Sequence, residues 1–251
     1  MTTPSSRFSP DAATPKAEIS VARRVAYTGV RSDIYELVPE SALKVLDLGC
    51  ADGSLGLALK EQIPGRCVFG VEYSPTLAEA ASLRLDHVIQ NDLSKPETLA
   101  NLRGGQFDCA ICADVLEHLQ HPEALLQTLR HCLAPNAALI VSLPNIRHIS
   151  ALTSIFLRGS FPRRQRGIFD DTHWRWFTVG DGHRLVSEAG FVVQQSNFIL
   201  RWGDQGGGRA NKLLNRFLAP AAPKLSPVRE FLSYQFVMRA SMLDAANKLT
   251  S

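Results

Sequence analysis

The chain has 251 residues, enough to bury the core of one α/β domain with appendages or of two small domains, and we take one domain as the expectation. Hydrophobic residues make up 45% and charged residues 20%, a composition that excludes a wholly disordered or fibrous chain. The net charge of +3 is too small to indicate a nucleic-acid-binding protein by itself. No stretch reaches the roughly 20 apolar residues that span a bilayer, and residues 1–16 contain no apolar signal segment, so we expect a cytoplasmic protein.

The five cysteines are an odd number and form no Cys-x-x-Cys pair. Most of them lie among apolar residues. The pattern predicts reduced, buried thiols rather than a zinc site.

Residues 1–20 are rich in Pro, Ser, Thr and Ala and show no apolar period, which predicts a flexible leader before a single domain over 21–251. Apolar spacing predicts a helix from residue 21 to the proline at 39. Strands and helices then alternate, which is typical of a mainly parallel sheet covered on both faces. The expected strands are 44–48, 67–71, 87–89, 107–113 and 138–143, and the expected helices 54–62, 76–84 and 122–132.

The alternation stops after Pro144. Residues 149–157 predict a short apolar helix, and residues 158–176 are irregular and basic, so 146–178 forms the expected acceptor-selecting insertion. The remainder, 179–251, predicts a helix over 179–189, strands over 191–198 and 234–239, and an amphipathic segment over 211–218. The whole pattern predicts a Rossmann-like, doubly wound sheet of seven strands with an insertion after the fifth.

A glycine-rich turn links the first expected strand to its helix, over Asp47-Leu48-Gly49-Cys50-Ala51-Asp52-Gly53. Such a turn brings backbone amides close to a ligand, although it also serves simply to pack a strand on a helix. The spacing is Gly-x-x-x-Gly and not the Gly-x-Gly of dinucleotide-binding folds. Asp47 stands where a carboxylate faces a ligand ammonium group, which favours a cofactor that carries an amino acid.

Two more carboxylates follow later strands. Glu72 comes directly after the second strand, where it can accept from both ribose hydroxyls, or simply be a solvated strand end. Asp92 follows the third strand, where it can accept from an adenine amine while Leu93 covers the ring; the Asn-Asp pair is also an ordinary turn.

These residues carry a resemblance to class I S-adenosylmethionine-dependent methyltransferases over roughly residues 45–145. The resemblance implies that Asp47 and the turn hold the methionine part of S-adenosylmethionine, Glu72 its ribose, and Asp92 with Leu93 its adenine. Ala51 replaces the Gly or Thr of many relatives and leaves the backbone contact in place. The expected cofactor-binding residues are Asp47, Gly49, Cys50, Ala51, Asp52, Gly53, Glu72, Tyr73, Asp92, Leu93 and Asp114.

The fourth strand ends in Asp114-Val115-Leu116-Glu117-His118, at the sheet edge where such folds bind ligands. His118 is the best candidate for a general base because its ordinary pKa lies near neutrality; the alternative is a role in bracing the next loop. Glu117 and His173 complete the expected catalytic residues, and His173 has loop packing as its alternative.

Asp114, Glu117 and His118 have the i, i+3, i+4 spacing that gathers side chains on one face of a helical turn. The spacing resembles the metal-binding element of ubiquinone-pathway O-methyltransferases and of small-RNA 2′-O-methyltransferases. That resemblance implies a divalent metal with His173 as a fourth ligand, but the same Leu-Glu-His occurs in methyltransferases without metal, and a metal is not favoured.

Residues 142–145, 169–178 and 187–191 resemble methyltransferases of bacterial glycan and small-molecule biosynthesis. We therefore expect O-methylation of a small-molecule or of a glycan or lipid-linked hydroxyl. RNA methylation is the first alternative, because Arg158, Arg163, Arg164 and Arg166 lie close to tryptophans. A nicotinamide-dependent oxidoreductase and a non-catalytic cofactor-binding subunit are the others, and residues 149–157 fit a lid, a dimer contact or a membrane-surface helix.

Overall fold

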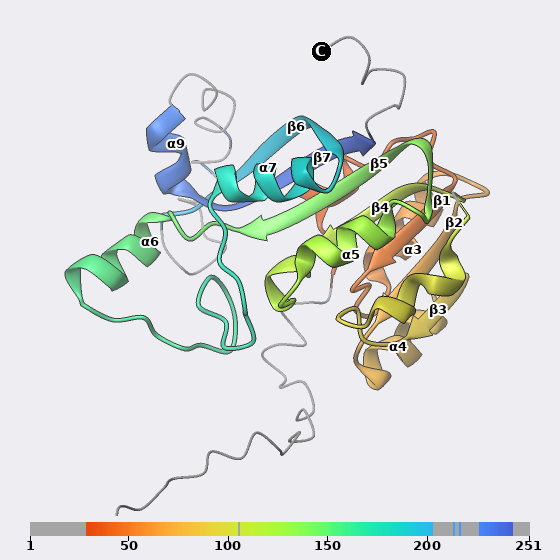
Figure 1. Cartoon of the computed structure of the whole chain (residues 1–251), viewed down its shortest axis with the longest axis horizontal. Coiled ribbons are helices and arrows are strands. Elements are labelled where there is room, and N and C mark those ends of the chain that lie inside the picture. Colours follow the sequence, from red (N-terminus) through yellow and green to blue (C-terminus); the bar gives the residue numbers. More distant parts are fainter. Residues whose placement is uncertain (1–28, 105, 203–212, 214–215, 217–225, 243–251) are drawn as a thin grey trace, which may run out of the picture.

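A computed structural model describes residues 29–104, 106–202, 213, 216 and 226–242 of the chain. The described residues form one seven-stranded sheet in the order β3-β2-β1-β4-β5-β7-β6 (Figure 1). The strands are β1 (Lys44–Leu48), β2 (Cys67–Glu72), β3 (His87–Gln90), β4 (Phe107–Ala113), β5 (Leu133–Pro144), β6 (Phe191–Leu200) and β7 (Ser233–Met242).

The first five strands run parallel, and β7 lies antiparallel between β5 and β6. Strand order turns back at β1 and β4, so the carboxyl ends of these two neighbours face the crevice where doubly wound sheets bind ligands. The predicted fold class is therefore confirmed, with one antiparallel hairpin at the far edge.

Helices cover both faces of the sheet. One face packs under α5 (Pro122–Leu129), α7 (Val179–Glu188) and the 3₁₀ segment η1 (Pro96–Leu102). The other packs under α2 (Ser32–Tyr35), α3 (Ser54–Gln62) and α4 (Pro75–Ser82). Alternate strand residues supply the two cores: Leu46 and Leu48 belong to the first and Val45 to the second, as the two-residue period of a strand requires.

Local signals explain where these helices begin. Proline is the first residue of α4 and of α5, where its missing N–H leaves no bond unmade. The α7 helix begins with a capping box, in which Thr178 accepts from the Asp181 amide and the Asp181 carboxylate accepts from Thr178. These signals are local in sequence, and the predicted helices 54–62, 76–84, 122–132 and 179–189 begin and end within three residues of α3, α4, α5 and α7.

Some predictions differ from the structure. The helix expected from residue 21 to the proline at 39 is only the short α2 within the described residues, because Gly29, with a φ of 120°, and Arg31, in an extended conformation, are not helical. The 3₁₀ segments η1 and η2 (Leu116–His118) and the helix α9 (Ser226–Leu232) were not predicted. The leader and the larger part of the expected 211–218 segment lie outside the described residues, and the division into leader and domain stays a prediction.

The expected insertion leaves the sheet after β5. It begins with α6 (Ile149–Leu152) and continues as a π-helical turn, η3 (Thr153–Leu157). In Figure 1 this part extends beyond the end of the sheet before the chain returns to α7. Among the described residues no helix combines the length and apolar character that crossing a membrane requires.

Candidate functional site

The β1–α3 turn adopts a conformation that restricts its residues. Gly49, Ala51 and Gly53 have φ angles of 76°, 50° and 78°. The Gly49 amide donates to the Val71 carbonyl at 2.7 Å, and a Cβ on Gly49 would lie 2.6 Å from a methyl of Val115. The turn is thus held against β2, and Val115 leaves no space for a side chain at Gly49.

Asp47 lies at the start of this turn and is 2% exposed. Burial, together with the nearby charge of Glu72, raises the pKa of Asp47 to about 7. No cationic side chain of the described residues pairs with Asp47 to offset its burial. A ligand ammonium group at this position would do so, which is the chemistry expected of an amino-acid-bearing cofactor.

Glu72 connects β2 to the turn. Its carboxylate accepts from the Ala51 amide at 3.0 Å and from the Ser74 amide at 2.8 Å. Burial raises the pKa of Glu72, while the backbone hydrogen bonds oppose that shift. Glu72 therefore fixes the turn, and its expected contact with a ribose stays a prediction, as does that of the neighbouring Tyr73, which is 45% exposed.

Two other residues of the turn direct their side chains into the protein. The Asp52 carboxylate accepts from the Ser54 amide at 3.1 Å and pairs with Arg84 at 2.7 Å. Cys50 is 5% exposed and packs against Gly70, where a Cβ would lie 2.5 Å from its sulfur. Any contact of Cys50 or Asp52 with a cofactor would therefore be made by the backbone, and such a contact stays a prediction.

Asp92 and Leu93 follow β3 as predicted. The Asp92 carboxylate accepts from the Ser94 amide at 2.9 Å, and its carbonyl accepts from the Thr98 hydroxyl at 2.6 Å. Leu93 packs against the core under α5. Their contact with adenine stays a prediction.

Asp114 lies directly after β4 in a strained conformation, with a φ of 56°. Arg31 pairs with it at 2.6 Å, the Ser142 hydroxyl donates to it at 3.2 Å, and the Gln235 amide also donates to it. Burial lowers the pKa of Arg31, but Asp114 and Asp33 outweigh that effect and raise it, so the guanidinium stays charged. Sequence reasoning missed Arg31 and Gln235, because both are far from Asp114 along the chain and neither belongs to a motif.

Glu117 is 1% exposed, and one of its carboxylate oxygens has no hydrogen-bond partner among the described residues. Burial, with the charge of Asp114, raises the pKa of Glu117 well above its ordinary value. Its carbonyl accepts from the Trp174 and Arg175 amides at 2.9 and 3.1 Å. The insertion is thereby fastened to the end of β4.

His118 is reached by a relay from the insertion. The Thr172 hydroxyl donates to Asp170 at 2.6 Å, and Asp170 is 2% exposed. A hydroxyl has one proton, so the Thr172 oxygen accepts from His118 Nδ1, which lies 3.0 Å away. The relay therefore places the proton of neutral His118 on Nδ1 and makes Nε2 the proton acceptor.

His173 lies beside His118, with the ring centroids 4.7 Å apart. Its Nδ1 lies 3.3 Å from the Ile168 carbonyl, which accepts from it. Burial and the neighbouring His118 lower the pKa of His173 to about 4, so it is neutral at neutral pH. The structure thus brings together the three expected catalytic residues.

Glu117, His118 and His173 each offer one ligand atom within 4.8 Å of the others. Two imidazoles and a carboxylate could hold a first-row transition metal. The expectation that Asp114 shares a helical face with Glu117 and His118 is wrong: Leu116–His118 is a 3₁₀ turn, and Asp114 bonds to Arg31 and Gln235 instead. His173 from the insertion takes its place in the cluster.

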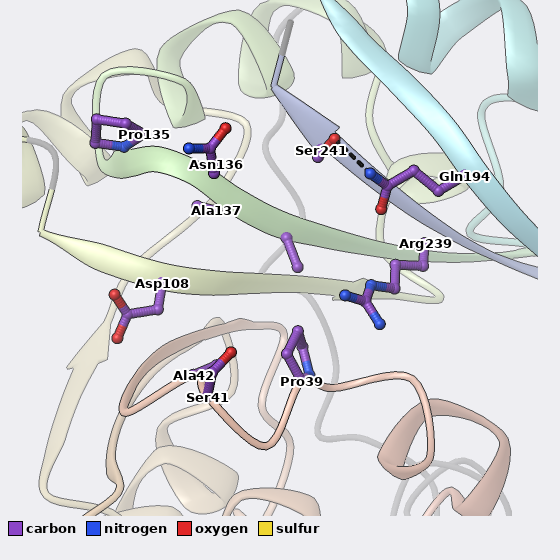
Figure 2. A pocket seen from close by; sticks show the side chains of 11 residues that line it. Pro39, Ser41, Ala42, Asp108, Pro135, Asn136, Ala137, Gln194, Arg239 and Ser241 are labelled. Atoms are coloured by element: carbon purple, nitrogen blue, oxygen red, sulfur yellow. Dashed lines mark hydrogen bonds between the residues drawn. The ribbon is translucent and has the colours of Figure 1, made fainter. Parts of the chain in front are cut away.

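A cavity of about 320 Å³ lies near the amino ends of β4 and β5, away from the carboxyl ends that carry the predicted site (Figure 2). It is bordered by Asp108 at the beginning of β4, by Arg239 of β7, and by Gln194, which donates to Ser241 at 2.9 Å. Asp108 accepts from two backbone amides there. None of the predicted site residues borders it.

Comparison with known proteins matches a region of the chain that includes the predicted site residues. A model of methyltransferase domains matches residues 14–196. Ubiquinone biosynthesis O-methyltransferase of Xylella fastidiosa is 36% identical over 124 residues, covering 48% of this chain and 50% of that protein. The enzyme of the same name from Psychrobacter arcticus is 30% identical over 161 residues, 60% of each chain. The chain thus spans about half to three-fifths of the length of these relatives.

Among solved structures, magnesium protoporphyrin IX methyltransferase of Synechocystis with bound S-adenosylhomocysteine superposes with a TM-score of 0.56. It is 16% identical, and the match covers 91% of this chain and 90% of that one, so it supports the fold alone. The family match spans most of the chain and includes the turn, Glu72 and the His118 cluster. The chain belongs to the class I S-adenosylmethionine-dependent methyltransferase family.

Proposed function

We propose that this protein transfers a methyl group to a hydroxyl oxygen of a small-molecule or a glycan or lipid-linked acceptor. The observation that carries the proposal is the Asp170–Thr172–His118 relay. It assigns the Nδ1 proton of His118, just after β4, to the bond with Thr172 and so makes Nε2 the nitrogen that can accept a proton. A hydroxyl needs a base when it becomes a nucleophile at neutral pH. The names of the O-methyltransferase relatives support the same chemistry over about half of their length.

The residues at the carboxyl ends of β1 and β2 fit the cofactor. Asp47 would bind its ammonium group and Glu72 its ribose hydroxyls, and the glycine turn between them would carry the backbone contacts. Arg31 pairs with Asp33 and Asp114, so it holds Asp114 in place beside the end of β4. S-adenosylmethionine supplies an electrophilic methyl group on its sulfonium sulfur.

His118 acts on the acceptor. Its Nε2 takes the hydroxyl proton, while Nδ1 keeps its own proton in the bond to Thr172. His173 is held neutral beside it and so does not oppose the positive charge that His118 gains. Alignment of the acceptor by the insertion would supply most of the rate.

The test is transfer of a labelled methyl group to two acceptor probes, a catechol and a methyl glycoside. We expect His118→Gln to lower turnover at least about 100-fold, the scale of general-base catalysis, while S-adenosylhomocysteine binding by calorimetry is unchanged. His121→Gln is the matched control, since the His121 side chain is 71% exposed on the same loop. Equal turnover by His118→Gln and wild type would refute the assignment of the base.

A second candidate is metal-assisted methyl transfer, favoured by the unpartnered Glu117 oxygen beside two imidazoles. The two candidates differ in one measurement. If His118 is the base, protein stripped with a chelator keeps its turnover. Loss of turnover that a divalent cation restores would assign the cluster to a metal instead.

A further inference from the structure

The insertion carries an exposed apolar tip. Ser154 is 4% exposed, and its hydroxyl and carbonyl bond to the Ser160 carbonyl and amide at 3.0 and 2.9 Å. These two bonds close the base of the loop 154–160. Between them, Phe156 is 77% and Leu157 is 81% exposed, so the loop presents two large apolar side chains to solvent.

A second apolar group lies on the returning chain. Phe161 is 48% and Trp176 38% exposed, and their rings meet edge to face at 5.1 Å. Phe161 also packs edge to face on the buried Phe169, at 4.9 Å. The exposed aromatic side chains are therefore anchored on a small core.

The charge around these side chains has one sign. Residues 149–169 contain four arginines and no Asp or Glu. All four arginines, Arg158, Arg163, Arg164 and Arg166, are exposed. The acids that follow are Asp170, which is buried, and the exposed Asp171.

We infer that this face, the loop 154–160 with its flanking arginines, docks on an anionic lipid membrane. Phe156 and Leu157 would enter the boundary between headgroups and acyl chains, and the arginines would contact lipid phosphates. A symmetric contact with a second copy would bring the same arginines together, so charge disfavours it. Leu157, the most exposed side chain of this face, has no ring for a nucleic-acid base to stack on, whereas a lipid interior accepts both Leu157 and the exposed Phe156.

The docking face adjoins the candidate site. The same insertion supplies Thr172 and His173, and its backbone bonds to Glu117. Figure 1 shows α6 projecting beyond the end of the sheet, so a membrane can reach the tip without meeting the core helices. An amphiphilic acceptor held in the membrane would then enter from this side.

Co-sedimentation of the full chain with vesicles tests the inference, and it needs no methyl transfer, so it can fail independently of the proposed function. The vesicles are phosphatidylcholine alone or mixed with phosphatidylglycerol. We expect binding to the mixed vesicles that weakens with added salt. Phe156→Ser with Leu157→Ser should lower the partition coefficient at least about tenfold, since burial of one large apolar side chain contributes about that much.

Arg163→Gln with Arg166→Gln should remove the preference for anionic vesicles. Leu83→Ser is the matched control. Leu83 is 86% exposed at the end of α4, beside β2 and β3 and away from the insertion (Figure 1), so this change should leave binding unchanged. Each variant must keep the wild-type melting temperature and affinity for S-adenosylhomocysteine. Absence of vesicle binding, or equal binding by all variants, would overturn the inference.

Two other results would also overturn it. A wild-type dimer that Phe156→Ser with Leu157→Ser converts to monomer, seen by light scattering without vesicle binding, would make the face a contact between copies. Salt-sensitive retention of RNA, lost in the arginine variant and without vesicle binding, would assign the face to nucleic acid.

Discussion

At the residue scale, Asp47 makes the strongest prediction about pH. Its folded-state pKa of about 7 is above its ordinary value of 3.8, so the folded state holds a proton that the unfolded state releases. The unliganded protein should therefore lose stability as pH rises from about 4 to about 7. A cofactor ammonium group favours the ionised form, and affinity should rise in the same direction.

We expect the affinity for S-adenosylhomocysteine, measured by calorimetry, to increase about tenfold between pH 6 and pH 8 as Asp47 ionises. Binding at pH 6 should release a proton, visible as a dependence of the heat on the buffer. In Asp47→Asn the affinity should be lower and nearly independent of pH over this range. An unchanged pH dependence in that variant would show that another group titrates.

Thr172 tests the relay to His118. Nitrogen chemical shifts of the His118 ring should report the Nδ1–H tautomer in the wild type. Thr172→Val removes the acceptor for that proton and should shift the ring toward a mixture of tautomers, with lower turnover and an unchanged affinity for S-adenosylhomocysteine. Thr172→Ser keeps the hydroxyl and should restore both signals; a Val variant with the wild-type ring shifts would exclude the relay.

At the element scale, the β1–α3 turn depends on Gly49. In Gly49→Ala the new methyl meets Val115 and the backbone is held at a φ of 76°. We expect the free energy of unfolding by urea to fall by about 1–3 kcal/mol, together with lost cofactor affinity. Ala51→Gly is the control, because it relieves a positive φ in the same turn, and it should not destabilise the protein.

The elements themselves were largely predictable from the sequence. Apolar runs and the prolines that begin α4 and α5 act locally, so their spacing alone placed the strands and these helices. Three elements, η1, η2 and α9, were missed for physical reasons. The η2 turn spans only three residues, η1 is a seven-residue 3₁₀ segment with no α-helical period, and α9 follows two prolines and has Pro227 as its second residue, which obscured its apolar period.

At the scale of the whole molecule, cofactor binding should stabilise the fold. S-adenosylhomocysteine at about one hundred times its dissociation constant should add about 2.7 kcal/mol to the free energy of unfolding. By scanning calorimetry we expect S-adenosylhomocysteine to raise the melting temperature and NAD to leave it unchanged, since the Gly-x-x-x-Gly turn follows Asp47. A shift with NAD alone would favour the oxidoreductase alternative.

The sequence by itself determined the fold class, the family and the expected cofactor residues, because a buried strand followed by Asp47, the glycine turn and Glu72 is a local pattern. Tertiary structure alone decided what these patterns do not contain. Arg31 and Gln235 meet Asp114 across 83 and 121 residues of chain, and β7 enters the sheet between β5 and β6 in reverse.

The candidate catalytic cluster was determined partly by the sequence and partly by the tertiary structure. The sequence predicts Glu117, His118 and His173 as catalytic residues, but only the folded insertion brings Thr172 to His118 and His173 to within ring contact. Contacts of this kind depend on the path of an irregular segment, which no repeating pattern of apolar residues specifies. The strands could be predicted because their apolar pattern repeats along the chain. The relay could not be predicted, since it is a single contact between distant residues.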